Sequence, residues 1–201
     1  GHLSHDMRTP LTAIVGMSEL AQKKDLPEAE RKKALGYLAQ AAEALREMVG
    51  DIMDHAALEQ GAPALRAAPF DLRQCLSDCV GLYRPIAESK EIALTLGMDQ
   101  NLPACAVGDS FRLRQALGNI ISNAVKFTES GSVRVYATCI ESTPQFLRLA
   151  VAVTDSGPGL AEDDQVRVFE SFQRGRDTAH TPGTGLGLNI ARTLARLMVG
   201  D

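Results

Sequence analysis

Two apolar stripes with the spacing of a heptad repeat run through the first 59 residues of the chain. The first advances in steps of four and three residues through Leu3, Met7, Pro10, Ile14, Met17 and Ala21. The second does the same through Leu35, Leu38, Ala42, Leu45, Val49, Ile52 and Ala56. Residues 23–29 (KKDLPEA) interrupt the pattern between them. The spacing therefore predicts two helices joined by a short loop as an antiparallel hairpin.

A lone hairpin cannot bury both stripes and their flanks. Pairing of two copies into a four-helix bundle would cover them, so we expect a homodimer through residues 3–59. Packing of the hairpin on its own chain is the alternative.

The hydrophobic pattern changes after a stretch rich in Gly, Pro and Ala at residues 59–71, which is typical of a linker. Beyond it, apolar residues alternate in strand fashion or recur with helical spacing. Helices are expected at residues 70–90, 110–127, 162–172 and 184–198, and strands at 91–98, 132–140 and 146–155. Asp71 is the expected N-cap of the first of these helices.

The expected fold class is α+β, with a helical hairpin followed by a two-layer α/β sandwich. We place the hairpin at residues 1–60, the linker at 61–70 and the α/β domain at 71–201. The last residues, LMVGD, stop short of the further strands that such a domain would have, so we expect strands to be missing at the C-terminal end.

Composition narrows the possible partners and compartments. The 201 residues carry a net charge of −4, and no basic run exceeds three residues, so nucleic acid is not expected as a partner. No apolar run has the ~18 residues of a membrane span. Of the four cysteines, Cys75 and Cys79 lie one helical turn apart on an apolar face and are expected to be buried free thiols.

His5 is the first candidate for chemistry. In the heptad frame it falls at the outermost position of its helix, with Asp6 beside it and Thr9 one turn on. Pro10 has no N–H to offer the carbonyl of Asp6, so we expect a bend there. A largely neutral imidazole next to a carboxylate can act as a nucleophile, and Asp6 would accept the proton of the ring or orient it. An ordinary surface histidine is the alternative.

A polar stripe follows the expected helix at 110–127, on the side opposite its leucines. It consists of Gln115, Asn119, Asn123 and Lys126. Asparagine is a poor helix former, so two of them within a helix are unexpected on a purely structural surface. An amide oxygen is a hard ligand that suits Mg²⁺, and a lysine one turn on can meet phosphate charge.

Two glycine-rich motifs complete the set. The first has Asp155 at a strand end, followed by Gly157 and Gly159; the glycines permit close approach of a flat ligand, and a buried carboxylate could accept from the amine of adenine. The second consists of Gly183, Thr184, Gly185, Leu186 and Gly187 at a helix start, where free N–H groups attract phosphate. For the first motif, the alternative is a simple turn after a strand. For the second, the alternative is a dinucleotide-binding fingerprint, but the strand that should directly precede such a fingerprint is absent from the predicted pattern.

The order of these motifs resembles the sensor histidine kinases of two-component signalling, in particular hybrid kinases. The residues 4–11 (SHDMRTPL) resemble their phospho-acceptor box, and 119–128 (NIISNAVKFT) resemble the N box. The two glycine boxes and the F box are similar to DSGPGL, GTGLGL and FESF. The resemblance covers nearly the whole chain.

The resemblance implies a dimerisation and histidine-phosphotransfer hairpin followed by an ATP-binding domain of the histidine kinase, gyrase and HSP90 type. His5 would take the γ-phosphate of ATP and pass it to an aspartate of a response-regulator receiver domain. Asn123 would hold Mg²⁺, with Asn119 and Lys126 near the phosphates and Asp155 at the adenine amine. Thr9 matches a position linked to phosphatase activity. The chain would be the cytoplasmic portion of a membrane-anchored sensor.

A departure from the family pattern in one loop leaves an alternative function open. The loop between Phe172 and Gly185 is short, carries His180 and Pro182, and lacks a Gly-Gly pair before its threonine. The alternative is a kinase-like regulator with weak or no ATP binding that controls another sensor kinase by pairing through the hairpin. An ATPase or chaperone of the same fold would not need His5 on a heptad hairpin. The intact His5, Asn123 and Asp155 favour the kinase.

Overall fold

The computed structural model describes residues 2–59, 64–170 and 184–200; of the side chains in these ranges, those of residues 2–6, 47, 58, 59, 162, 163 and 166 are left out of the description. The chain forms two compact units, each of which is described by itself. Unit 1 comprises Gly1–Gly61 with Asp163–Asn189, and unit 2 comprises Ala62–Glu162 with Ile190–Asp201.

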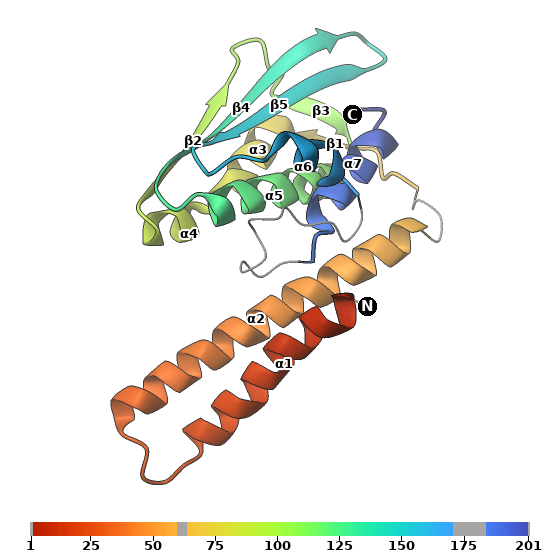
Figure 1. Cartoon of the computed structure of the whole chain (residues 1–201). Coiled ribbons are helices and arrows are strands. Elements are labelled where there is room, and N and C mark those ends of the chain that lie inside the picture. The colour runs from red at the N-terminus through yellow and green to blue at the C-terminus, as the bar shows by residue number, and fades with distance from the viewer. Residues whose placement is uncertain (1, 60–63, 171–183, 201) are drawn as a thin grey trace. The chain divides into compact units, whose positions relative to one another are not determined.

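The helical hairpin of unit 1 has the two helices that the apolar stripes predict (Figure 1). Helix α1 spans His2–Ala21 and runs through Pro10, whose side chain is buried, while α2 spans Glu28–Glu59. The turn between them, at residues 22–27, overlaps the expected break at residues 23–29. The helical prediction for this part of the chain is therefore confirmed.

Of the stripe predicted for α2, Leu38, Leu45, Ile52 and Ala56 are half-buried in the single chain. Leu35, Ala42 and Val49 are exposed in the single chain. The inner line of α2 has the same steps of four and three, but runs through Ala34, Leu38, Ala41, Leu45, Met48 and Ile52, of which Ala34 and Met48 are buried. Leu35, Ala42 and Val49 therefore lie on a face of α2 that the single chain leaves uncovered.

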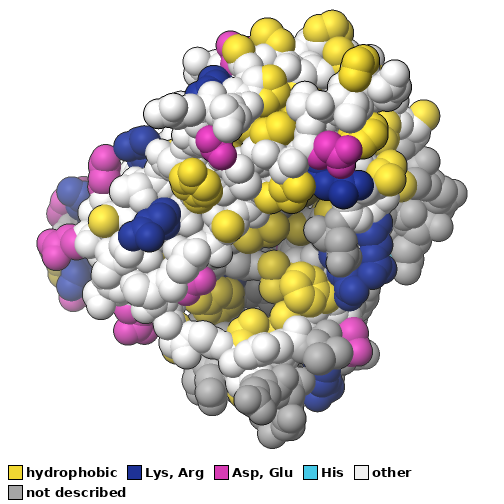
Figure 2. Space-filling view, turned by 90° about the horizontal axis from the view of Figure 1, so that it is seen from above, with side chains coloured by type: hydrophobic (Ala, Val, Ile, Leu, Met, Phe, Trp, Pro, Cys, Tyr) yellow, Lys and Arg dark blue, Asp and Glu magenta, His cyan; other side chains and the backbone are white. Residues whose placement is uncertain are grey.

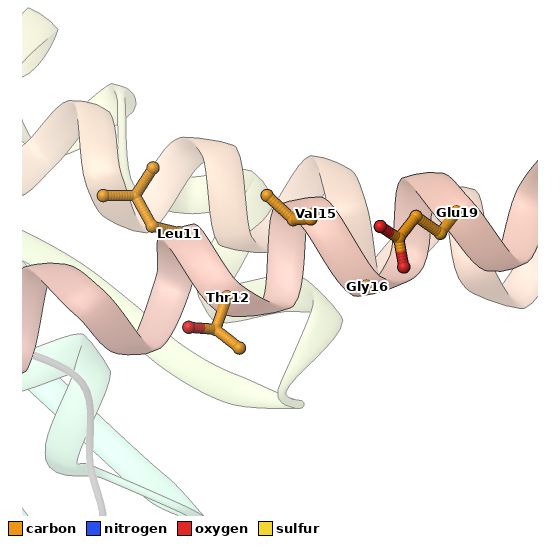
Figure 3. A pocket seen from close by; sticks show the side chains of 5 residues that line it. All are labelled: Leu11, Thr12, Val15, Gly16 and Glu19. Atoms are coloured by element: carbon orange, nitrogen blue, oxygen red, sulfur yellow. The ribbon is translucent and has the colours of Figure 1, made fainter.

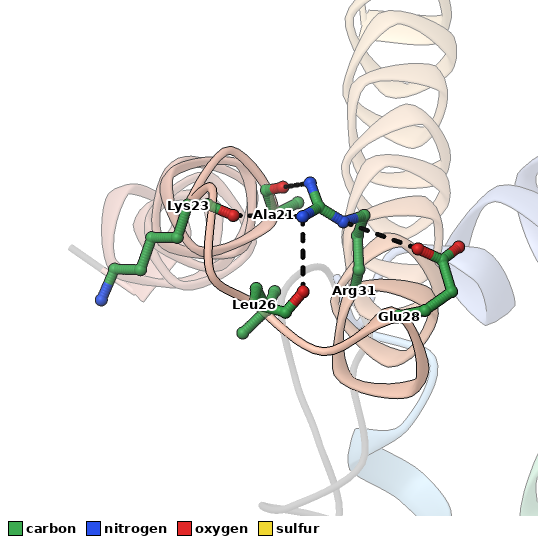
Figure 4. A network of polar contacts seen from close by, with 5 residues as sticks. All are labelled: Ala21, Lys23, Leu26, Glu28 and Arg31. Atoms are coloured by element: carbon green, nitrogen blue, oxygen red, sulfur yellow. Dashed lines mark hydrogen bonds and ion pairs between the residues drawn. The ribbon is translucent and has the colours of Figure 1, made fainter.

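Arg31 fixes the turn of the hairpin (Figure 4). Its guanidinium donates to the carbonyl oxygens of Ala21 at 2.7 Å, Lys23 at 3.1 Å and Leu26 at 3.4 Å. The last carbonyls of a helix have no partner within it, and a cation near them is favoured by the helix dipole. Arg31 thus caps the C-terminal end of α1 from the first turn of α2.

The α/β part of unit 2 is built on a three-stranded sheet in the order β2–β4–β5. Strand β2 (Ile92–Met98) is parallel to β4 (Gly131–Ser142), which is antiparallel to β5 (Leu147–Asp155). Helices α3 (Leu72–Gly81) and α5 (Ser110–Phe127) cover one face of it (Figure 1). The two layers meet in a core that includes Leu76, Ile121, Val125, Val133 and Val135. The mixed α+β fold with a two-layer domain is confirmed.

The helix expected at residues 70–90 is two helices. Helix α3 ends at Gly81, and α4 spans Arg84–Ser89 with Pro85 in its first turn. Proline suits the start of a helix and disrupts an interior, so the chain re-initiates there. The expected N-cap is confirmed, because the side chain of Asp71 accepts a hydrogen bond from the backbone N–H of Gln74.

Two short strands were not expected. Strand β1 (Ala68–Asp71) lies in the stretch assigned to the linker and pairs antiparallel with β3 (Cys105–Gly108). Each has four residues, which is too short for an alternation of apolar and polar residues to stand out in the sequence, so the pattern gave no signal. Asp109 follows β3 and accepts from the backbone N–H groups of Arg66 and Arg112, which joins this pair to the start of α5.

The C-terminal helices are shorter than predicted. Helix α6 spans Glu162–Arg167 and α7 spans Gly187–Leu197, against expected ranges of 162–172 and 184–198. Residues 171 and 172 of the first range lie outside the described part of the chain.

Apolar side chains also reach the surface. In unit 2, Tyr136, Ile140 and Phe146 are about half exposed. Figure 2 shows hydrophobic side chains interspersed with charged ones on the face that it displays. Cys75 and Cys79 are buried free thiols, as expected, and burial raises the pKa of Cys79 to about 11, so this thiol stays protonated near neutral pH.

Candidate nucleotide and phosphotransfer sites

Helix α5 presents the polar stripe that the sequence predicts. Gln115, Asn119, Asn123 and Lys126 are all half-buried, while Leu117, Ile121 and Ala124 are buried in the core. Gln115 accepts a hydrogen bond from the guanidinium of Arg112 at 2.8 Å. The two asparagines therefore lie on the side of α5 turned away from the sheet.

The first glycine motif packs on the C-terminal end of α5. A Cβ atom built on Gly157 would lie 3.1 Å from the carbonyl oxygen of Phe127, the last residue of the helix. Gly159 has φ +73°, a conformation that side chains rarely adopt. The backbone structure by itself therefore favours glycine at both positions. The motif lies against the turn that carries Lys126.

Asp155 was expected to be buried, and it is exposed. Its Oδ1 accepts from the backbone N–H of Gly157 at 2.9 Å, so the carboxylate closes the turn after β5. A residue at the end of a sheet strand is accessible unless another layer covers it. The carboxylate is available to solvent and to a ligand.

Ser156 is a residue of this motif that sequence reasoning missed. Its hydroxyl donates to the carbonyl oxygen of Ser130 and accepts from the backbone N–H of Ser132. Gly131, between them, has φ +104°, and a Cβ there would lie 2.3 Å from Ser156 Oγ. The Ser–Gly pair fixes the motif to the start of β4; an isolated serine in a turn gave no signal for this.

The second glycine motif lies partly in the described region. Gly183 is outside it, whereas Thr184 and Leu186 are buried, Gly185 has φ +69° and Gly187 is the first residue of α7. The expected position at a helix start is therefore confirmed for Gly187. Within unit 1, the Thr184 hydroxyl donates to the carboxylate of Asp51 on α2 and accepts from the backbone N–H of Leu186.

The F box (FESF, residues 169–172) is joined to α7 by a hydrogen bond from Asn189. The side-chain amide of Asn189 donates to the carbonyl oxygen of Phe169 at 2.9 Å. Residues 171–183, which include His180 and Pro182 of the loop discussed above, lie outside the described residues.

The candidate phospho-acceptor lies on α1. The backbone of His5 and Asp6 belongs to the helix, but their side chains lie outside the description, so the outward direction of His5 stays a prediction. Thr9 is exposed. His5 belongs to unit 1, whereas α5 and Asp155 belong to unit 2.

An open depression lies along α1 (Figure 3). It is lined by Leu11, Thr12, Val15, Gly16 and Glu19. Leu11 and Val15 are about half exposed, so the depression offers apolar contact next to polar groups.

The donor groups suit Mg²⁺ held chiefly by phosphate. In the described part of the chain, no three His, Cys, Asp or Glu side chains form a cluster that could hold a metal ion. Mg²⁺ usually keeps several waters and takes one or two protein ligands besides phosphate oxygens. The half-buried amide of Asn123 fits that limited role.

Comparison with protein families matches both parts of the chain. Residues 1–61 match the His Kinase A (phospho-acceptor) domain, and residues 108–201 match the histidine kinase-, DNA gyrase B- and HSP90-like ATPase family. The chain belongs to the sensor histidine kinases. The resemblance drawn from the five motifs is confirmed, and the matched ranges together form the catalytic core of that family.

Curated sensor kinases match over almost the whole chain. The chain is 34% identical over 202 residues to the sensor histidine kinase GacS of Pseudomonas protegens, and 33% identical over 202 residues to the signal transduction histidine-protein kinase BarA of Escherichia coli. It is 38% identical over 200 residues to the sensor histidine kinase AruS of Pseudomonas aeruginosa. These matches cover 98–100% of the chain, which spans only 20–22% of those relatives.

Solved histidine kinases share the fold. Full-length ShkA in complex with AMPPNP is 34% identical, with a TM-score of 0.70, and the match covers all of this chain and 41% of that one. ThkA in complex with the response regulator protein TrrA has a TM-score of 0.68 at 21% identity, covering 99% of this chain and 54% of that one. Among the described residues, no helix has both the length and the apolar character needed to cross a membrane.

Proposed function

We propose that this sensor histidine kinase core binds ATP with Mg²⁺, autophosphorylates on His5 and passes the phosphoryl group to an aspartate of a response-regulator receiver domain. The observation that carries the proposal is the meeting, within unit 2, of the asparagine-bearing helix α5 with the first glycine motif at the contact of Phe127 and Gly157. A polar helix face and a glycine turn at its end offer amide oxygens, an ammonium and a carboxylate to one nucleotide.

The roles follow from the chemistry of each group. The exposed carboxylate of Asp155 would accept from the adenine amine, and Gly157 and Gly159 would let the base approach. Asn119 and Lys126 would contact phosphate oxygens, and Asn123 would supply an amide oxygen to Mg²⁺. Bound Mg²⁺ would neutralise phosphate charge during transfer. Phosphoryl transfer depends mainly on positioning and charge neutralisation, which such groups can provide.

The second glycine motif would meet the phosphates. Gly183, Thr184, Gly185, Leu186 and Gly187 precede or open α7, where unpaired N–H groups favour an anion. The hydrogen bond between Thr184 and Asp51 would have to open for the Thr184 hydroxyl to donate to a phosphate oxygen.

His5 is proposed as the nucleophile because the exposed stripe of α1 points to it. Thr9, Thr12, Gly16 and Glu19 are all exposed and recur every three or four residues. Continuing that stripe one turn toward the N-terminus reaches His5. Asp6 would orient the ring or accept its proton. Thr9, one turn away, is proposed for positioning water in dephosphorylation.

Pairing of two copies is proposed from the apolar residues left exposed on the hairpin. Leu35 is 53% exposed and Val49 40% exposed, and both belong to the heptad pattern of α2. A four-helix bundle would bury them.

The depression beside Leu11 and Val15 is proposed as the contact for the receiver domain. The cellular placement, as a cytoplasmic portion of a membrane-anchored sensor, stays a prediction.

The proposal is tested by intact-mass analysis after incubation with ATP and Mg²⁺. The expected result is a gain of one phosphoryl group per chain that is abolished in Asn123→Ala. Asn101→Ala, an exposed asparagine outside the site, is the matched control and should retain the gain. If the native chain gains no phosphoryl group and binds no ADP in calorimetry, the kinase proposal fails.

A further inference from the structure

Lys90 places its ammonium at the C-terminal end of α5. Its Nζ donates to the carbonyl oxygens of Val125 at 2.8 Å, Lys126 at 2.8 Å and Thr128 at 2.7 Å. A lysine ammonium has three donors. All three are therefore used on the last turn of the helix that carries the nucleotide-site asparagines.

The local backbone aims Lys90 at this turn. Lys90 is the C-cap of α4, and its N–H donates to the carbonyl oxygen of Ala87. Glu91 follows with φ +57°, an uncommon conformation for a residue with a side chain. The chain then enters β2 at Ile92, which pairs with Gly131 of β4. The direction of Lys90 is thus fixed from both sides.

The interaction is electrostatically favourable. The last four carbonyl groups of a helix lack intrahelical partners and carry partial negative charge. Thr128 contributes from the other side, because its buried hydroxyl donates to the carbonyl oxygen of Ala124. Lys90 and Thr128 together satisfy four carbonyl groups at this end.

Within residues 125–128, Lys90 binds every carbonyl oxygen except that of Phe127. The first glycine motif packs against this remaining oxygen. Phe127 lies between Lys126 and Thr128, and its oxygen is the backbone atom that faces Gly157. Fixing its neighbours on either side fixes the surface that supports the motif. The same turn carries the side chain of Lys126.

We propose that Lys90 is a positioning residue for nucleotide binding, which sets the relative position of α5 and the first glycine motif without contacting the nucleotide. This inference rests on the proposed function of that site. Loss of the ammonium would loosen the turn at 125–128 and the motif at 155–159 together, and nucleotide affinity would fall.

The first test needs no nucleotide. Amide hydrogen exchange is measured in Lys90→Met and in Arg84→Met, which removes the same charge from an exposed position of the same helix. We expect exchange at the N–H groups of Thr128 and Gly157 to quicken at least about fivefold in Lys90→Met, while Val133 and Val135 exchange as in the native chain. Arg84→Met should leave all four unchanged. Native exchange at Gly157 in a folded Lys90→Met overturns the proposal.

The second test measures ADP affinity by calorimetry with Mg²⁺. We expect Kd to rise about tenfold in Lys90→Met and to stay within twofold in Arg84→Met. Lys90→Arg keeps the charge, but its planar fork cannot direct one nitrogen at three carbonyl groups, so an intermediate Kd is expected. A lowered melting temperature with a native Kd would show a merely structural role and would overturn the proposal.

This design distinguishes failure of the proposed function from failure of the proposal for Lys90. If the native chain binds no ADP, the proposed function fails, and the exchange at Gly157 still decides whether Lys90 positions the motif. If Lys90→Met does not fold, Lys90→Gln, which retains two donors, is measured in the same way with the same expected direction.

Discussion

Gly157 lies so close to the carbonyl oxygen of Phe127 that a Cβ atom on it would be 3.1 Å away, and 2.8 Å from Oδ1 of Asp155. The first contact is with backbone, which can give way only by a shift of the end of α5, and the second is with the exposed side-chain carboxylate that accepts from the N–H of Gly157. The first glycine motif and the end of α5 are therefore fitted to each other without spare room.

Gly157→Ala is expected to separate the motif from α5 and to weaken ADP binding at least tenfold in calorimetry. Overpacking of a fitted contact typically costs about 1–3 kcal/mol. Gly81→Ala is the matched control, because a Cβ there meets nothing within 4 Å. Native affinity in folded Gly157→Ala would refute the fit.

Asp109→Ala is expected to lower the free energy of unfolding by about 1 kcal/mol at pH 7, the usual value of an N-cap. The backbone N–H of Arg66, with that of Arg112, holds the pKa of Asp109 below its ordinary value. The carboxylate therefore contributes stability above the unfolded pKa of about 3.9, and loses it as the pH falls through the lowered folded pKa.

Denaturant titrations of both chains at a series of pH values check this. The difference between native and Asp109→Ala should be constant from neutral pH down to about pH 4–5 and shrink below it. A difference that grows with acidification would contradict the assigned role.

Arg31→Met is expected to destabilise the hairpin by about 1–3 kcal/mol, because three carbonyl groups at the turn lose a charged donor. Denaturant unfolding followed by helical circular dichroism measures the effect. Lys32→Met removes the same charge from the neighbouring exposed position and should change stability by less than about 0.5 kcal/mol. Equal effects of the two substitutions would show that only charge matters.

Leu35→Glu is expected to convert a dimer into a monomer, since the proposed four-helix bundle would have to bury the new charge. Light scattering coupled to size exclusion measures the mass. Lys33→Glu also adds an acidic residue to α2, at an exposed polar position, and should leave the dimer intact. A dimer that survives Leu35→Glu would place the interface elsewhere.

Long, strongly periodic segments were predictable from the sequence. Helix α5 and strands β4 and β5 match their expected ranges because 9–18 residues repeat one burial pattern. Strands β1 and β3 were missed because four residues carry too little pattern. The helix break before α4 was missed because apolar residues recur with helical spacing on both sides of Pro85.

The candidate site likewise contains residues that the sequence pattern singles out and residues that it does not. Asn123, Asp155 and Gly157 were singled out by residue type and position, and their roles at a nucleotide stay predictions. The contributions of Ser156 and Lys90 depend on contacts with residues 26 and 35–38 positions away, which no local pattern encodes. Heptad spacing alone does not distinguish the line of α2 that packs on α1 from the line that the single chain leaves exposed, because both lines advance in the same steps.

The central claim is that a nucleotide held in unit 2 donates its γ-phosphoryl group to His5. Incubation of the native chain, His5→Ala and His2→Ala with γ-labelled ATP and Mg²⁺ tests it most directly. The account predicts label that is lost in acid and kept in alkali, present in the native chain and His2→Ala, and absent from His5→Ala. Acid-stable label, or label that persists in His5→Ala, would contradict it.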